Sequence, residues 1–418
     1  MKKIPIIPFL LVASLFLMWG VANNMNDTLL AAFKRIMSMS DLQTSLVQFA
    51  FYGAYFCFAL PAALFIRRFS YKAGILLGLA LYAAGTMLFL PAGNAASYGF
   101  FLFAIYVMAS GCSILETTAN PYILAMGPKE SATRRLNIAQ TFNPLGAIIG
   151  ILLSRHFILS ELNQAGEAER SGMSQDALRA IQEQELSAIS GTYMLIGGIL
   201  IALLIIILLV KMPALKDDSQ SISIADTFRR LAKNKPYRNG VIAQFFYVGL
   251  QTCAWSFTIR LVMAETGQTE SEAAMVFLWS IIAFTACRFI FTWLMRYVKP
   301  AKLLFLAAII GIIAVLGVMN LHGIAVCIAI VAISGAMSLM FPTIYGIALE
   351  NVDSQSAKIA ASGLIMAILG GALITPLQAL LSDRFGITAS FIIPLICFVV
   401  ILIYSISIIH ANRNSAAA

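Results

Sequence analysis

Residues 6–33 read IIPFLLVASLFLMWGVANNMNDTLLAAF, a long apolar run that one short polar stretch interrupts. A transmembrane helix needs about 17–25 mainly apolar residues, so this run is long enough to cross a bilayer. Its basic start resembles a secretory signal peptide, but the run exceeds the about 7–15 apolar residues of such signals and has no clear cleavage site. We therefore expect an uncleaved first span.

Comparable runs recur through the whole chain of 418 residues, which is 60% hydrophobic and 11% charged, with a mean hydropathy of +0.87. Soluble domains are about half apolar and about a quarter charged. Because hydrocarbon offers no water to the backbone, these runs must be helical. We predict an all-α membrane protein with twelve transmembrane helices, near residues 6–33, 45–66, 73–93, 98–126, 136–159, 191–211, 238–262, 272–296, 302–320, 323–349, 358–381 and 387–409.

The twelve predicted spans divide six and six at a charged, Ser-rich segment, residues 212–237. Its composition is typical of a linker. We therefore predict an N-terminal six-helix bundle over residues 1–211, a cytoplasmic linker over residues 212–237 and a C-terminal six-helix bundle over residues 238–418. A second polar segment, residues 160–190, predicts an outer loop with a short surface helix.

Short sequence similarities connect the two halves of the chain. The segment 67-RRFSYKAGILLG-78 resembles 296-RYVKPAKLLFLA-307, and 146-GAII-149 resembles 371-GALI-374 at nearly the same offset. Each match is weak alone, but a near-constant offset indicates an internal duplication. We therefore expect two pseudo-symmetric bundles in the parallel-repeat arrangement of secondary transporters.

The formal charge of +9 is explained by membrane topology. With the N-terminus inside, most of the 28 Lys and Arg residues fall in cytoplasmic segments, including residues 67–72, 134–135 and 211–238. Cytoplasmic loops of membrane proteins carry this positive excess. We therefore expect both termini to be cytoplasmic and the protein to have no nucleic-acid partner. We also expect a multi-pass protein of a bacterial inner (plasma) membrane, monomeric in the lipid bilayer.

Of the 19 acidic residues, 17 lie in loops or at the ends of predicted spans, and Asp27 and Glu116 are the two exceptions. An ionised carboxylate at the bilayer centre costs about 2.5–3.5 kcal/mol on insertion scales, so such residues are candidates for function. A buried acid without a nearby cation is stable when neutral and can carry a proton. We therefore predict that Asp27 and Glu116 couple transport to protons.

Several spans present amides and aromatic rings on one helical face. The seventh span does so with Gln244, Tyr247, Gln251 and Trp255. Amides donate and accept hydrogen bonds, as sugar hydroxyls do, and flat rings cover the apolar face of a pyranose. We expect these faces to meet in one cavity that binds a neutral sugar. The predicted substrate-binding residues are Asn24, Gln48, Tyr52, Glu116, Asn120, Gln140, Asn143, Tyr247, Gln251 and Trp255. The alternative for each amide is a bond to a neighbouring helix.

Other classes of function are disfavoured by particular residues. Arg288 is the one inward candidate for an anionic substrate, and we expect it to snorkel towards the cytoplasmic surface or to form a salt bridge between the halves. The six cysteines form no CxxC pair and the three histidines lie at span ends, so we expect no metal site, no cofactor and no catalytic residues. A drug:proton antiporter, sodium coupling and a non-transporting sugar sensor remain open.

Several strings resemble L-fucose:proton symporters of the major facilitator superfamily. They are ANNMNDTLL, SYKAGILLGLALYAAG, LETTANPYI, RRLNIAQTFNPLGAII, AQFFYVGLQTCAWSFTIR and FPTIYG. The resemblance covers nearly the whole chain and is strongest in the first five spans. It implies the major facilitator fold and import of a sugar with protons by alternating access. L-Fucose is the favoured sugar, with galactose and glucose as alternatives.

The resemblance also implies residue roles. It places the two key ionisable groups of the family at Asp27 and Glu116, for proton coupling and sugar recognition. It favours Gln140 and Asn143 as sugar ligands. Pro144 stands where the family pattern has serine, and a proline there restricts Asn143 and removes a donor. This departure leaves the sugar preference open.

Overall fold

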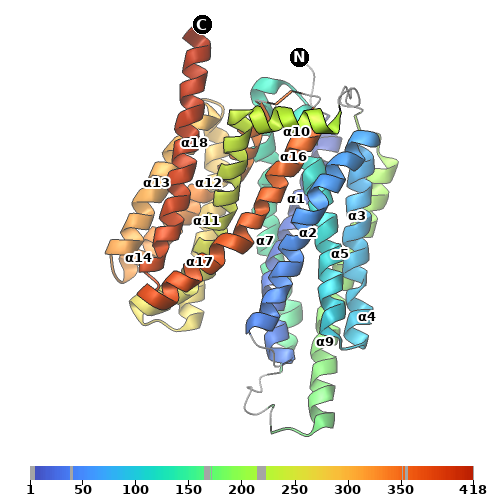
Figure 1. Ribbon diagram of the computed structural model, residues 1–418. Helices are drawn as coiled ribbons and strands as arrows, with labels where there is room; N and C mark the ends of the chain where they lie inside the picture. Colours follow the sequence, from blue (N-terminus) through green and yellow to red (C-terminus); the bar gives the residue numbers. More distant parts are fainter. Residues whose placement is uncertain are drawn as a thin grey trace. The chain divides into compact units, whose positions relative to one another are not determined.

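The computed structural model describes residues 5–37, 41–163, 170, 172–213, 223–350, 352–353 and 356–417. All regular elements in these ranges are helices (Figure 1), so the predicted all-α class is confirmed. Of the predicted linker, residues 214–222 lie outside the described ranges, and the predicted outer loop is described only in part.

Apart from α10, which lies in the predicted linker, the helices coincide with the predicted spans, one helix or one broken pair to each. Those of the first half are α1 (Ile6–Ile36), α2 (Asp41–Arg68), α3 (Tyr71–Met87), α4 (Phe89–Asn94), α5 (Tyr98–Ala125), α6 (Ala132–Gln140), α7 (Phe142–Leu153) and α9 (Gln175–Leu209). Those of the second half are α10 (Ile224–Lys233), α11 (Lys235–Thr266), α12 (Glu270–Leu294), α13 (Pro300–Asn320), α14 (Ile324–Met337), α15 (Met340–Glu350), α16 (Ala357–Met366), α17 (Gly370–Phe385) and α18 (Ile392–Ala417).

Within the described part of the chain, eleven helical segments are long and apolar enough to cross a membrane, judged by length and composition. The predicted seventh span, α11, is not among them although it has 32 residues. Its sequence is interrupted by polar residues such as Gln244, Gln251 and Arg260, which lower its hydropathy. The helix that fails the apolar criterion is therefore the one with the longest predicted substrate-facing stripe.

Four spans are broken into two helices. The third changes from α3 to α4 at Leu88, the fifth from α6 to α7 at Thr141, the tenth from α14 to α15 at residues 338–339, and the eleventh from α16 to α17 through the 3₁₀ turn Ala367–Leu369. Prolines closely follow three of these breaks, Pro91 in the third span, Pro144 in the fifth and Pro342 in the tenth. Proline supplies no N–H and therefore weakens helical bonding just before it.

Two glycines allow equivalent helices of the two halves to approach closely. A Cβ atom added to Gly146 in α7 would lie 2.0 Å from the Leu17 carbonyl oxygen in α1. One added to Gly370 in α17 would likewise lie 2.0 Å from the Phe245 carbonyl oxygen in α11. Real Cβ contacts are never this short, so both positions require glycine. The first and fifth spans thus pack as the seventh and eleventh do, in agreement with the predicted duplication.

Residues 5–119 and 145–214 form one compact unit, and residues 120–144 with the chain from residue 215 onward form the other. The end of α5 and all of α6 therefore pack with helices of the second half. α6 contacts α12 and α15, which places a predicted substrate-binding amide, Gln140, against second-half residues.

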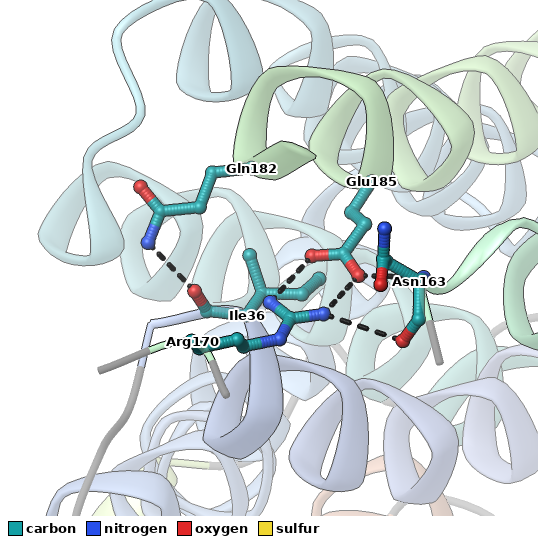
Figure 2. Close-up of polar contacts among 5 residues, drawn as sticks. All are labelled: Ile36, Asn163, Arg170, Gln182 and Glu185. Atoms are coloured by element: carbon teal, nitrogen blue, oxygen red, sulfur yellow. Dashed lines mark hydrogen bonds and ion pairs between the residues drawn. The ribbon is translucent and has the colours of Figure 1, made fainter. Parts of the chain in front are cut away.

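The polar segment before the sixth span is held by a buried ion pair. The predicted surface helix is the start of α9, which projects beyond the ends of α4 and α5 (Figure 1). Arg170 and Glu185 are 3% and 1% exposed, and Arg170 Nη1 donates to Glu185 Oε2 at 3.0 Å. Figure 2 shows that Glu185 also accepts from the Asn163 backbone N–H at 2.9 Å, and that Gln182 donates to the Ile36 carbonyl at 2.8 Å. These bonds attach the segment to α9, and α9 to the end of α1.

Candidate functional site

α5 carries one of the two predicted intramembrane acids on a buried face. Glu116 is 4% exposed, while Ser113 and Asn120, one turn before and after it, are fully buried. The Ser113 hydroxyl donates to the Tyr55 carbonyl in α2 at 3.2 Å, which fixes this face against α2. Pro121 lies inside α5, and the helix continues beyond it to Ala125. The polar face predicted for the fourth span is therefore formed and shielded from bulk water.

α1 carries the other acid. Asp27 lies within α1, but its side chain is outside the described residues. One turn before it, Asn24 donates from Nδ2 to the Gly20 carbonyl at 3.0 Å, a bond within its own helix. Gln48 and Tyr52 of α2 are both half-buried. A contact that sequence reasoning missed joins the two helices, because the Trp19 indole donates to the Tyr55 hydroxyl.

The amides of the fourth and fifth spans meet directly. Gln140, at the end of α6, is 4% exposed and donates from Nε2 to Oδ1 of the fully buried Asn120 at 2.8 Å. Asn143 follows in the first turn of α7 and is half-buried. A primary amide both donates and accepts hydrogen bonds, as the hydroxyls of a sugar do. Two predicted sugar ligands are thus brought together.

Arg288 of α12 is buried beside this pair, so the prediction that it snorkels to the surface is wrong. It is 3% exposed, and its guanidinium donates from Nη1 to the Gln140 carbonyl at 3.0 Å and from Nε to the Ser338 carbonyl at 2.6 Å. The guanidinium carbon lies 4.7 Å from the ring centroid of Phe284, a cation–π distance. In the described ranges no carboxylate lies within ion-pair distance of Arg288, so its alternative role as a salt bridge is not formed there either.

α11 presents the predicted stripe on a largely buried face. Gln244 and Tyr247 are fully buried, whereas Gln251 and Trp255 are half-buried. Neither polar atom of the Gln244 amide has a hydrogen-bond partner among the described residues, and neither has the Tyr247 hydroxyl. Buried polar groups normally have partners, so this face has unused capacity for water or a polar solute.

Trp255 connects the α11 stripe to the amide pair. Its indole donates to Ser334 Oγ in α14 at 3.2 Å, and its ring meets the Phe284 ring edge-on with centroids 5.1 Å apart. Phe284 in turn supports Arg288, which bonds to Gln140. A continuous path of contacts therefore runs from an aromatic ring to two amides. Sequence reasoning missed Phe284 and Ser334, because neither residue type stands out in an apolar span.

A second polar row continues along α6. Thr133 donates to Glu350 Oε1 at 2.5 Å, and Asn137 donates to Thr343 Oγ1 at 3.3 Å, both partners lying on α15. With Gln140, these residues follow i, i+4, i+7 and share one helical face. Gly346 allows α6 and α15 to approach closely, since an added Cβ would lie 2.6 Å from Thr133 Oγ1.

Across the described residues there is no cluster of three or more His, Cys, Asp or Glu side chains that could hold a metal.

Long, broken apolar helices that bury amides and charged side chains such as Glu116 and Arg288 are typical of a polytopic transporter. The Major Facilitator Superfamily profile matches residues 9–373. The chain is 45% identical over 416 residues to an L-fucose-proton symporter of Haemophilus influenzae, covering 97% of each chain. It is 38% identical to the L-fucose-proton symporter of Escherichia coli strain K12, covering 96% of this chain and 92% of that one.

A solved structure supports the same assignment. FucP, a major facilitator transporter in the outward conformation, superposes with a TM-score of 0.90 at 37% identity, over 97% of this chain and 99% of that one. The chain belongs to the major facilitator superfamily and, within it, to the family of L-fucose-proton symporters. The predicted fold and family are thereby confirmed.

Proposed function

We propose that this protein imports L-fucose together with protons by alternating access. The observation that carries the proposal is the Asn120–Gln140 amide pair, joined through Arg288 and Phe284 to Trp255, in a chain closely similar to L-fucose-proton symporters. Donor and acceptor groups beside aromatic rings suit a neutral sugar, whose hydroxyls need both and whose C–H face packs on rings.

Three groups of residues contact the sugar. Glu116, Asn120, Gln140 and Asn143 bind sugar hydroxyls on one side, and Tyr247, Gln251 and Trp255 cover the sugar from α11. Asn24, Gln48 and Tyr52 complete the contacts from α1 and α2.

Asp27 is the first choice for the proton carrier, and Glu116 senses both sugar and proton. A carboxyl group held away from water and cations is most stable when neutral, so it takes up a proton before the site closes and releases it when the site opens to the other side. The membrane potential contributes about 2.3 kcal/mol per charge per 100 mV, enough for one proton to drive accumulation of a neutral sugar.

The protein acts as a monomer in a bacterial inner membrane, with both termini in the cytoplasm. The two six-helix bundles, residues 1–211 and 238–418, rock about the site, and residues 212–237 connect them on the cytoplasmic side. The internal duplication marked by Gly146 and Gly370 supports this division.

Uptake by vesicles containing the protein tests the proposal. Labelled fucose, galactose and glucose are offered with and without a proton gradient, and external pH is recorded. We expect fucose to be accumulated only with the gradient and to cause external alkalinisation. Asp27→Asn should abolish accumulation while leaving sugar exchange across the membrane. Accumulation by Asp27→Asn at the wild-type level would refute the proton role of Asp27.

The same assay separates the other classes of function. A sugar sensor would bind fucose without moving it, and a drug:proton antiporter would move cationic dyes and ignore sugars. Preference for galactose or glucose over fucose would change the proposed substrate and leave the coupling mechanism intact.

A further inference from the structure

We infer that Arg288 is a positioning residue for sugar binding. Its guanidinium supplies the hydrogen-bond donors that Pro144 and Pro342 remove from the backbone of two broken spans. This inference rests on the proposed function, because its readout is the affinity for sugar. Arg288 need not touch the substrate in this role.

Both carbonyls that Arg288 bonds lie four residues before a proline. In an unbroken α-helix, the carbonyl of residue i accepts from the N–H of residue i+4. The residue four positions after Gln140 is Pro144, and the residue four positions after Ser338 is Pro342. Neither proline has an N–H. The two carbonyls freed in this way are the ones that accept from Arg288, at 3.0 and 2.6 Å.

The environment explains why a substitute donor is needed there. Gln140 and Ser338 are buried, at 4% and 0% exposure, so bulk water does not supply hydrogen-bond donors to their carbonyls. A buried carbonyl without a donor costs about 1–3 kcal/mol. Arginine is suited to the task, because its planar fork presents several N–H groups in fixed directions. Lysine, with donors on a single nitrogen, cannot match two separated carbonyls in the same way.

The bond to Gln140 acts on the sugar site through the backbone. Arg288 holds the carbonyl of the last residue of α6, and the side chain of that same residue donates to Asn120. The Phe284 ring packs against the guanidinium of Arg288, and Trp255 packs against Phe284. Removing Arg288 therefore loosens the helix break that aims the Gln140 amide.

A rescue experiment tests the inference. Arg288→Met keeps an apolar stem but removes both donors, and we expect the KM for fucose to rise about tenfold or more, the equivalent of one hydrogen bond to a charged group. Adding Pro144→Ala restores an N–H four residues after Gln140. The double variant should recover a KM within about threefold of the wild-type value, because the two changes act on one carbonyl.

Pro61→Ala in the Arg288→Met background is the matched control, since Pro61 also lies inside a transmembrane helix, α2, but no contact to Arg288 involves it. We expect no recovery of KM from this control. An unchanged KM in Arg288→Met, or equal recovery from Pro144→Ala and Pro61→Ala, would overturn the inference. If Arg288→Met does not fold, Arg288→Lys with and without Pro144→Ala carries the same comparison.

Thermal unfolding of the same variants separates this inference from the proposed function. Pro144→Ala should raise the Tm of Arg288→Met more than it raises the Tm of the wild-type protein. If the wild-type protein moves no fucose, the proposed function fails, while this coupling of Tm values still reports whether Arg288 serves the Gln140 carbonyl. Absence of the coupling refutes the pairing even where fucose is transported.

Discussion

Two buried arginines in this protein are satisfied in opposite ways. Arg170 binds the carboxylate of Glu185, and both side chains are almost completely buried. Arg288 is equally buried but bonds to two neutral carbonyls and an aromatic ring. The first charge is cancelled by a fixed partner, whereas the second is only solvated by its surroundings.

The difference separates a structural contact from one that a transport cycle can exchange. Parting a buried ion pair leaves two uncompensated charges, so the Arg170–Glu185 contact is expected to persist through every state. Moving a guanidinium from one set of carbonyls to another, or to water, leaves no opposite charge behind. Arg288 bonds α6 to second-half helices without an opposite charge, so this contact is the more easily exchanged of the two.

The largest effect on stability is expected at the ion pair. Arg170→Met leaves Glu185 buried without its cation, and the free energy of unfolding should fall by about 3–5 kcal/mol. Thermal unfolding in detergent measures this loss. Arg179→Met is the matched control, because Arg179 is exposed on α9, the helix that carries Glu185, and its replacement should have almost no effect.

Arg288→Met is expected to destabilise the protein less, by about 1–3 kcal/mol, because it leaves two carbonyls without donors but no unpaired charge. The same unfolding measurement gives the comparison with Arg170→Met. A greater loss at Arg288 than at Arg170 would break the distinction drawn between the two arginines.

The polar row along α6 adds a third case to the comparison, in which the donor is a neutral hydroxyl, that of Thr133. Thr133→Val removes the hydroxyl that donates to Glu350 but keeps the shape of the side chain. We expect a loss of about 1 kcal/mol in the free energy of unfolding, typical of one hydrogen bond. Thr266→Val, which removes a bond within a single helix, α11, is the control for fucose uptake. Thr133→Val should alter the uptake rate and Thr266→Val should not.

The smallest effect is expected at Glu265, a carboxylate near the end of α11. Its hydrogen bonds from Thr388 and with His322 hold the pKa of Glu265 below its usual value of 4.5. A lowered pKa in the folded state stabilises the protein above the unfolded-state pKa, and this contribution disappears as the pH falls through the folded-state value. Because the contact is near the surface, its size is a few tenths of a kcal/mol.

Unfolding at pH 7 and at pH values below 4.5 measures this contribution. Thr388→Val should make the difference between the two conditions smaller, and an unchanged pH dependence would contradict the role of Thr388. His322 is exposed, so its own contribution to this contact is screened by solvent.

The spans could be predicted from sequence because apolar length alone decides them. The breaks within spans are harder to predict, since prolines at residues 61 and 121 leave their helices continuous whereas Pro144 and Pro342 follow breaks. At Pro144 and Pro342 the freed carbonyls accept from a distant donor, Arg288, and tertiary contacts of that kind leave no local pattern. This is also why snorkelling was the wrong expectation for Arg288.

Of the predicted site, the Asn120–Gln140 pair was foreseeable because both residues lie on polar helical faces. The Trp255–Phe284–Arg288 path was not, because phenylalanine in an apolar span is indistinguishable from lipid-facing residues in sequence. Thr133, Thr343 and Glu350 were similarly hidden, as each reads as an ordinary residue near the end of a span. Their roles arise only when α6 packs on α15.

The polar stripe of α11 has a consequence for how the protein is made. Polar residues at the centre of a helix oppose its release from the translocon into lipid, each by up to about 2.5–3.5 kcal/mol if charged. α11 is the predicted span that lacks an adequate apolar window, and the strongly apolar α12 is synthesised directly after it. Its partition into the bilayer therefore depends on a partner helix that covers the stripe during synthesis. The polar residues of α11 thus make its insertion a cooperative event.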